Sequence, residues 1–306
     1  MKSIVITGAS GYLGKRLLDR LSDLYQDCEI FALFRNTPIN KSKDNITPIK
    51  VDLSKANDYR KLPLKFDKLL HLAGDKRTFL RDVHGIQQFE YNNNLTKLMV
   101  DYLKKSTCNS LVFASSVYIY SGTKFNPFNE DNINLPKDYL GLSKLTNELY
   151  LKSHSLEGKF NTICLRIFTT YGAHLDNKQF VSNAIHRLRS SSKKEKFFNP
   201  HVYRDFIHID DVVEAFVRSI KLLNQKCENY FKSINIATGK STTIKDLILE
   251  IIEFTETDKE IEFIDGSHYS NDIDHFADIK KMKSLFNWVP KIELSNGLGA
   301  LLRENG

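Results

Sequence analysis

A glycine-rich turn near the N-terminus has the residue types and spacing that hold a phosphate group. Thr7–Gly14 reads Thr-Gly-Ala-Ser-Gly-Tyr-Leu-Gly and directly follows an apolar run of strand length, Ser3–Thr7. Gly8 permits a tight turn, Gly11 lets the backbone approach a pyrophosphate, and Gly14 lets a following helix pack on the strand, whose neighbouring helix N-terminus adds a positive dipole. The pattern predicts a dinucleotide site within Ile4–Leu18. The cofactor-binding residues expected in it are Gly8, Gly11, Tyr12, Leu13 and Gly14.

The end of the second apolar run indicates which dinucleotide is bound. An NAD-binding protein usually carries an acid there, about 20 residues beyond the last glycine, to hold the ribose hydroxyls. Here Leu33 and Phe34 are followed by Arg35 and Asn36, and there is no acid. The planar guanidinium of Arg35 suits a 2′-phosphate, although a plain surface arginine would look the same in sequence. The sequence therefore favours NADP(H), with NAD(H) as the alternative.

Apolar runs of strand length alternate with amphipathic stretches through the first half of the chain. Such alternation predicts an α/β fold with a Rossmann-type doubly wound parallel sheet. The expected strands are Ser3–Thr7, Glu29–Phe34, Lys68–Leu72, Ser110–Ala114 and Asn161–Phe168, and the clearest helical stretches are Gly14–Leu24 and Asn93–Lys105.

After Phe168 the alternation gives way to shorter elements, which predict a smaller, interleaved C-terminal substrate domain. The expected elements are a strand at Arg204–His208, a helix at Asp210–Leu223, a strand at Ser233–Ile236 and a helix at Thr243–Thr255. We expect residues 1–168 plus about 206–235 to form the dinucleotide-binding domain. Residues from about 169–205 plus 236–306 would form the substrate-binding domain.

Composition narrows the class of protein. The chain has 306 residues, 41% of them hydrophobic, which is enough for one large core without disulfides. Its four cysteines lie far apart, so we expect reduced thiols and no metal site. The net charge of +7 is spread along the chain, which argues against a nucleic-acid partner. No apolar run approaches the roughly 20 residues that span a bilayer, so we expect a cytoplasmic protein that does not enter a membrane.

Further segments match one known family in order along nearly the whole chain. They are Val51-Asp52-Leu53, His71–Gly74, Phe113–Ser116, Gly141–Lys144 with Glu148, Leu165–Gly172, Arg204–Val212, Asn235–Gly239 and Trp288–Pro290. In these segments the sequence resembles the extended short-chain dehydrogenase/reductase family of nucleotide-sugar epimerases, dehydratases and reductases. The resemblance implies a nucleotide-diphosphate sugar as substrate and a homodimer.

The resemblance also assigns residues to the cofactor and to the reacting sugar. It implies that Lys144 binds the nicotinamide ribose and lowers the pKa of a catalytic tyrosine, as an ammonium beside a phenol does. Ser116 matches the residue that hydrogen-bonds the reacting sugar oxygen, with Ser115 as the alternative if the register shifts by one. The remaining cofactor contacts that it implies are Asp52 and Leu53 at the adenine and Leu72, Ala73 and Gly74 in the cofactor cleft.

The catalytic tyrosine is where the sequence departs from the family. The family tyrosine stands four residues before the lysine, and this chain has Leu140 there, with Tyr139 one residue earlier. In a helix, one residue turns a side chain by about 100°. We take Tyr139 as the provisional proton donor, which requires a late helix start and a shifted backbone. Tyr118 or Tyr120 is the alternative donor.

The substrate residues are altered as well. Arg204 matches an arginine that clamps the nucleotide diphosphate, and its alternative is a structural ion pair. A second family arginine near residue 272 is absent, so His268 is expected to help hold the diphosphate. Thr170, with Thr169, stands where the family usually has a substrate-binding asparagine.

Three functions remain open. The dehydratases of the family carry an Asp-Glu pair directly after the catalytic threonine, and this chain has Val117 and Tyr118, so dehydration is disfavoured. Arg35 favours an NADPH-dependent reductase of a nucleotide-activated 4-keto(-6-deoxy) sugar. The alternatives are an NAD(P)-dependent nucleotide-sugar epimerase and, because of Leu140, a catalytically impaired nucleotide-binding or regulatory protein.

Overall fold

The computed structural model divides into two compact units, which we call unit 1 and unit 2. It describes residues 1–40, 43–77, 83–124, 126–173, 179–225, 229–266 and 274–304. Unit 1 consists of Met1–Thr123, Glu130–Ile167 and Val213–Ile234. Unit 2 consists of Lys124–Asn129, Phe168–Val212 and Asn235–Gly306.

The division differs in detail from the boundaries expected from sequence. The short segment Lys124–Asn129 groups with unit 2, and the chain returns to unit 1 at Val213. The segment belongs to unit 2 because Phe128 N donates to the Phe276 carbonyl (2.8 Å) and Asn126 Nδ2 donates to the Asp274 carbonyl (3.0 Å). The cofactor and substrate roles of the two units remain predictions.

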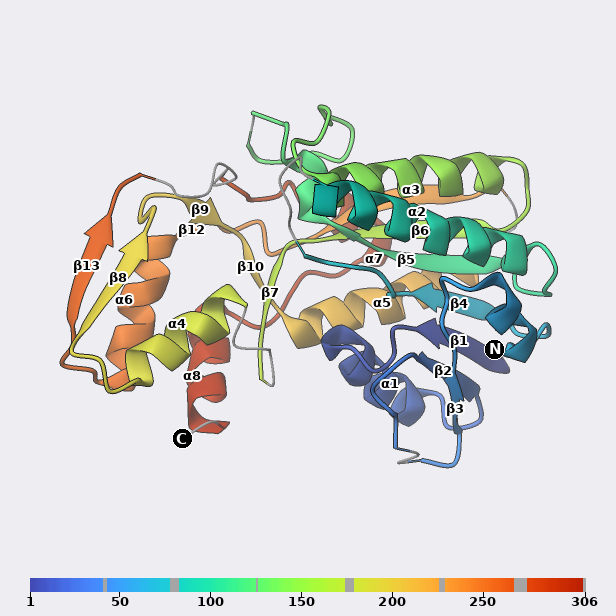
Figure 1. Ribbon diagram of the computed structural model, residues 1–306, viewed down its shortest axis with the longest axis horizontal. Helices are drawn as coiled ribbons and strands as arrows, with labels where there is room; N and C mark the ends of the chain where they lie inside the picture. Colours follow the sequence, from blue (N-terminus) through green and yellow to red (C-terminus); the bar gives the residue numbers. More distant parts are fainter. Residues whose placement is uncertain are drawn as a thin grey trace. The chain divides into compact units, whose positions relative to one another are not determined.

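Unit 1 is built on a seven-stranded sheet whose order is β11-β6-β5-β4-β1-β2-β3 (Figure 1). The pairings from β6 to β3 are all parallel, which confirms the expected Rossmann-type sheet. The strands are β1 (Ser3–Thr7), β2 (Glu29–Phe34), β3 (Ile46–Lys50), β4 (Lys68–His71), β5 (Ser110–Ser116), β6 (Asn161–Ile167) and β11 (Phe231–Ile236).

Strand β3 was not expected from the sequence, because it contains Pro48 and lacks a long apolar run. A proline cannot donate a ladder hydrogen bond, so it is tolerated on an edge strand. The sheet order places β3 at its edge, beside β2 alone. Strand order reverses between β1 and β4, and ligands bind at such a switch point in open α/β sheets.

Helices cover both faces of this sheet. Helices α2 and α3 lie side by side on one face, and α1 lies on the other (Figure 1). Arg20 of α1 is 3.8 Å from Glu214 of α5, so these two helices are neighbours. The helices are α1 (Tyr12–Leu24), α2 (Val83–Leu103), α3 (Tyr139–Leu156) and α5 (Ile209–Leu223), with short 3-10 turns η1 (Ala56–Lys61) and η2 (Val117–Tyr120).

The core under α2 and α3 is apolar and closely packed. Leu69, Leu111 and Cys164, from three neighbouring strands, are buried against Leu95 and Met99 of α2. Removing this surface from water is the main force that holds the helices on the sheet. Three cysteines, Cys28, Cys108 and Cys164, are buried free thiols, while Cys227 lies outside the described residues.

Two searches of the described residues bear on function classes. Within the described ranges, no group of three or more histidine, cysteine, aspartate or glutamate side chains is placed to hold a metal ion. No helix in the same ranges combines the length and apolar character needed to cross a membrane.

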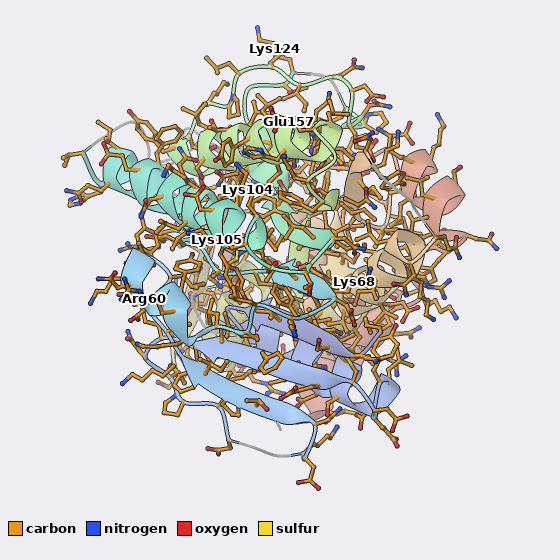
Figure 2. The ribbon with its side chains drawn as sticks, turned by 90° about the vertical axis from the view of Figure 1, so that its right-hand side faces the viewer. Arg60, Lys68, Lys104, Lys105, Lys124 and Glu157 are labelled. Atoms are coloured by element: carbon orange, nitrogen blue, oxygen red, sulfur yellow. The ribbon has the colours of Figure 1, made fainter. Side chains whose placement is uncertain are left out.

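The amino and carboxyl edges of the sheet differ in what they carry. Figure 2 looks towards the amino edge, where Lys68 begins β4, Lys104 and Lys105 follow α2, and Glu157 follows α3. The ammonium of Lys68 donates to Ser110 Oγ (2.9 Å) at the start of β5, so it is a structural group. The glycine turn after β1 therefore lies at the opposite, carboxyl edge.

Unit 2 contains short two-stranded sheets and helices. Its strands pair as β7 (Thr169–Tyr171) with β10 (Phe206–His208), β9 (Tyr203–Arg204) with β12 (Thr242–Thr243), and β8 (Lys194–Phe198) with β13 (Glu260–Ile264). Its helices are α4 (Phe180–Arg189), α6 (Ile244–Thr255), α7 (Lys280–Phe286) and α8 (Leu294–Glu304). The expected helix at the start of α6 is capped by Thr243, whose Oγ1 accepts from Asp246 N (2.9 Å).

A single buried carboxylate ties three segments of unit 2 together. Asp205 accepts hydrogen bonds from Thr238 N (2.8 Å) and Thr238 Oγ1 (2.6 Å) through Oδ1. Its Oδ2 accepts from Gly239 N (2.8 Å) and Ala277 N (3.4 Å). Because Asp205 stands between β9 and β10, the strand expected at Arg204–His208 is interrupted there.

We expect Asp205→Ala to destabilise the protein by about 3 kcal/mol, because it leaves several buried donors without acceptors. Chemical denaturation followed by circular dichroism measures the change. The control is Asp265→Ala, which removes a carboxylate that is 77% exposed in the same unit and should leave the midpoint in place. Equal midpoints for Asp205→Ala and the unaltered chain would show that the clamp adds nothing.

Candidate functional site

The glycine turn closes tightly at the junction of β1 and β4. Gly8 has φ +67°, a conformation that favours glycine, and a Cβ there would lie 2.9 Å from Ala73 N. A Cβ at Gly14 would lie 2.2 Å from the Gly8 carbonyl oxygen. Helix α1 begins at Tyr12 with Gly11 as its cap, which has no side chain to satisfy the first N–H groups of the helix. These residues form a cradle that fits a pyrophosphate.

A hydroxyl at the end of β1 holds the end of β4 in place. Thr7 Oγ1 accepts from Leu72 N and Ala73 N, both at 3.1 Å, which fills its two lone pairs. The hydroxyl must then donate to His71 Nδ1, 2.8 Å away. Burial lowers the pKa of His71 to about 3, and Lys144 adds to this effect. His71 is therefore a neutral structural residue.

Lys144 places an ammonium at the carboxyl ends of β4 and β5. Its Nζ donates to the Ala114 carbonyl (2.7 Å) and lies 4.7 Å from the centre of the Phe113 ring. A Cβ at Gly74 would be 3.8 Å from the same nitrogen. Burial lowers the pKa of Lys144 to about 8, although the carboxylate of Glu148 opposes the shift. The ammonium has further N–H bonds for a ligand such as a ribose hydroxyl.

The two serines at the end of β5 have different surroundings. Ser115 is buried, and its hydroxyl donates to Glu148 Oε1 (2.5 Å). Ser116 is half-buried, and its Oγ accepts from Tyr118 N (3.3 Å) where η2 begins. Successive residues of a strand point to opposite faces, which separates the two hydroxyls. Ser116 is therefore the serine that stays accessible at the carboxyl edge.

Behind Ser115 lies a buried ion pair between α3 and β6. Arg166 Nη2 is 2.7 Å from Glu148 Oε2, and the two side chains are 4% and 3% exposed. Arg166 Nη1 also donates to Tyr120 Oη and to the Glu130 carbonyl, both at 2.9 Å. Ser233 Oγ donates to the same Glu148 oxygen (2.7 Å). The sequence showed Glu148 and Arg166 only as family matches, and nothing in their spacing indicates that they pair.

This network removes one alternative proton donor. Tyr120 is fully buried, its hydroxyl is bound by Arg166, and burial raises its pKa. Tyr118 is only half-buried. Of the two tyrosines near Ser116, Tyr118 alone remains a candidate.

The start of α3 settles how Tyr139 and Leu140 are placed. Asp138 caps the helix by accepting from Gly141 N (2.8 Å), so α3 begins at Tyr139 and has no late start. Leu140 is 3% exposed and points into unit 1. The half-buried ring of Tyr139 packs against Phe89 of α2, with centroids 6.2 Å apart. The two side chains are therefore offset by about 100°, as helix geometry requires.

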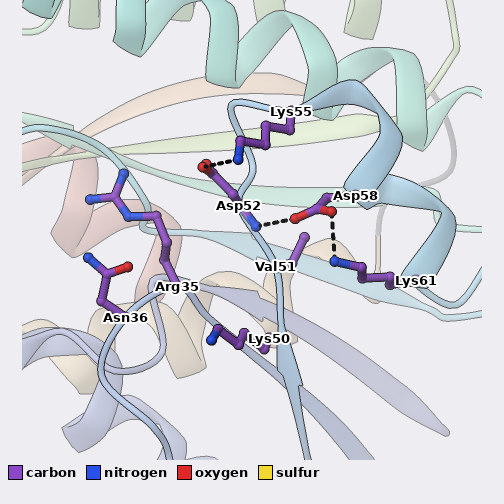
Figure 3. Close-up of a pocket in the computed structure, with 8 residues that line it drawn as sticks. All are labelled: Arg35, Asn36, Lys50, Val51, Asp52, Lys55, Asp58 and Lys61. Atoms are coloured by element: carbon purple, nitrogen blue, oxygen red, sulfur yellow. Dashed lines mark hydrogen bonds and ion pairs between the residues drawn. The ribbon is translucent and has the colours of Figure 1, made fainter.

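A pocket of about 410 Å³ lies beyond the ends of β2 and β3 (Figure 3). It brings together two residues that the sequence assigns to the cofactor, Arg35 and Asp52. Leu53 is buried beside them, and Arg35 Nη1 donates to Tyr91 Oη (2.8 Å). The residues that line the pocket are Arg35, Asn36, Lys50, Val51, Asp52, Lys55, Asp58 and Lys61.

The expected substrate residues belong to unit 2. Arg204 lies in β9, opposite Thr242 of β12, and its Nη1 donates to the Tyr203 carbonyl (3.1 Å). Thr170 lies in β7, and its Oγ1 donates to the Phe168 carbonyl (3.1 Å). His268 lies outside the described residues. The roles of these residues remain predictions.

We expect Glu148→Ala to cost about 3–5 kcal/mol of stability, because it leaves the buried Arg166 guanidinium without its partner. Urea denaturation measures the loss. Glu157→Ala is the control on the same helix, since that side chain is 55% exposed. The double variant Glu148→Leu with Arg166→Met should recover part of the loss, and no recovery would contradict the pairing argument.

Comparison with known proteins places this arrangement in a family. The family model described as "NAD dependent epimerase/dehydratase family" matches residues 4–237. The chain is 31% identical over 204 residues to dTDP-4-dehydro-6-deoxyglucose reductase of Escherichia coli, a match that spans 66% of this chain and 63% of that protein.

Two solved structures share the fold over nearly their whole length. MoeE5 in complex with UDP-glucuronic acid and NAD has a TM-score of 0.84 at 22% identity, covering 100% of this chain and 99% of that one. RMD from Pseudomonas aeruginosa, complexed with NADPH, has a TM-score of 0.81 at 19% identity, covering 99% and 97%. The chain therefore belongs to the NAD dependent epimerase/dehydratase family, within the extended short-chain dehydrogenase/reductase enzymes.

Proposed function

We propose that this enzyme uses NADPH to reduce the C4 ketone of a nucleotide-activated 4-keto-6-deoxy sugar. The observation that carries the proposal is Arg35, a cation at the end of β2 where an acid would hold the ribose of NAD. A reductase consumes its reduced cofactor at every turnover, whereas an epimerase returns the hydride to the sugar. The likeness to a dTDP-4-dehydro-6-deoxyglucose reductase supports the same reaction.

The residues at the carboxyl edge of unit 1 supply the polar groups that the reaction needs. NADPH, when bound, supplies the hydride. Ser116 hydrogen-bonds the ketone oxygen and stabilises the negative charge that develops there. Lys144 holds the nicotinamide ribose through its ammonium, and Tyr139 donates the proton. In unit 2, Arg204 and Thr170, with His268, bind the nucleotide-diphosphate sugar.

The residues after Ser116 argue against water elimination. Dehydration needs an acid and a base beside the sugar, and Val117 and Tyr118 supply neither carboxylate. Val117 is 5% exposed and belongs to the core. Reduction needs a single proton donor, which is a smaller demand on this site.

A second candidate is a nucleotide-binding protein with little or no turnover. The observation that favours it is the start of α3, because Leu140 is buried and Tyr139 packs on Phe89. Such a protein would bind the dinucleotide through the glycine turn and leave every sugar unchanged.

Incubation with C4-deuterated NADPH and a panel of nucleotide 4-keto-6-deoxy sugars tests the proposal. We expect one sugar to gain one deuterium, as measured by mass spectrometry of the products. Isomerised sugars without deuterium would instead indicate an epimerase. Unchanged sugars in the presence of bound cofactor would support the binding protein.

The assignment of Tyr139 has its own test. Tyr139→Phe removes only the hydroxyl, so kcat should fall by about 10²–10⁴ while the Kd of the cofactor stays the same. Steady-state kinetics and a binding titration measure the two quantities. Tyr118→Phe is the matched comparison, and a loss of turnover there with full activity in Tyr139→Phe would transfer the role to Tyr118.

A further inference from the structure

The pocket in Figure 3 carries more positive charge than its own acids neutralise. Four basic side chains and two carboxylates line it. Lys61 Nζ is 2.6 Å from Asp58 Oδ1, and Lys55 Nζ is 3.9 Å from Asp52 Oδ2. These two pairs leave Arg35 and Lys50 as the surplus cations of the pocket.

The two carboxylates are held within their own turn. Asp52 Oδ1 accepts from Ser54 N (3.1 Å) and Ser54 Oγ (2.7 Å), and Asp58 Oδ2 accepts from Asp52 N (2.8 Å). Burial raises the pKa of Asp52, but the hydrogen bonds from Ser54 outweigh it and hold that pKa below its usual value. Neither acid is therefore directed at Arg35 or Lys50 as a hydrogen-bond partner.

The sheet register places the two surplus cations next to each other. Lys50 is the Cα partner of Phe34 in the pairing of β3 with β2, and Arg35 is the next residue after Phe34. Val51 N donates to the Phe34 carbonyl (2.8 Å), so the ladder continues to the point where both strands end. Figure 3 shows both side chains, with Asn36, at the rim of the same pocket.

We propose that Lys50 completes, with Arg35, a two-cation site for the 2′-phosphate of NADPH. This inference rests on the proposed function, which supplies the cofactor. A 2′-phosphate carries close to two negative charges near neutral pH, which matches the surplus charge of the pocket. Arg35 provides a planar fork for two phosphate oxygens, and Lys50 provides a point charge from the neighbouring strand.

The site accounts for selectivity as well as affinity. NADH presents a hydroxyl where NADPH presents the phosphate, so it gains nothing from a second cation. Lys50 should therefore contribute to NADPH binding alone, whereas residues of the glycine turn contribute to both cofactors. The ratio of the two dissociation constants isolates the role of Lys50 from any general weakening of the site.

Isothermal titration of the purified full chain with NADPH and with NADH tests the site. We expect Lys50→Ala to weaken NADPH binding about tenfold, the effect of losing one charge-assisted hydrogen bond, and to leave NADH binding unchanged. Lys65→Ala is the control, because Lys65 is an exposed lysine of unit 1 that does not line the pocket. Adenosine 2′,5′-bisphosphate and adenosine 5′-monophosphate serve as probes that reach only this end of the site.

Each result decides the proposal. A selective loss for NADPH and for the bisphosphate supports it. An unchanged NADPH-to-NADH ratio in Lys50→Ala, or an equal change in Lys65→Ala, overturns it. An unaltered chain without preference for NADPH overturns it together with the cofactor of the proposed function. A selective loss without deuterium transfer to any sugar keeps the phosphate site and rejects the reaction alone.

Discussion

The close approach of Gly8 to Ala73 is the constraint on which the cofactor end of unit 1 depends. These residues join β1 to β4, the two strands between which the sheet order reverses. A side chain at position 8 would push the strands apart, and the Thr7 hydroxyl holds them together by bonding Leu72, Ala73 and His71. The crevice at this switch point exists because the backbone is held that closely.

The buried pair of Glu148 and Arg166 plays the corresponding part at the ends of β5 and β6. A buried ion pair is costly to desolvate, and it specifies one arrangement because either partner alone is worse than both. Glu148 engages Ser115, and it lies one helical turn beyond Lys144 on α3. The same pair thus separates a structural serine from the accessible Ser116 and moderates the charge of Lys144.

The sequence predicted most strands of unit 1, because buried parallel strands are continuous apolar runs. It missed β3, whose Pro48 conceals an edge strand, and it began α2 ten residues late at Asn93. The strand at Arg204–His208 was expected to be continuous, but the side chain of Asp205 bonds Thr238 and Gly239 instead of leaving the ladder intact. These differences arise where a side chain or a sheet edge decides the local structure.

The sequence by itself determined the glycine turn, the absence of an acid after β2, and the replacement of a tyrosine by Leu140, because each depends on residue type at a known spacing. Only the tertiary structure decided that Ser115 is occupied by Glu148, that Tyr120 is bound to Arg166, and that Lys50 stands beside Arg35. These relations join strands and helices far apart in the chain. Local periodicity predicts the elements, whereas strand register and burial decide which side chains meet.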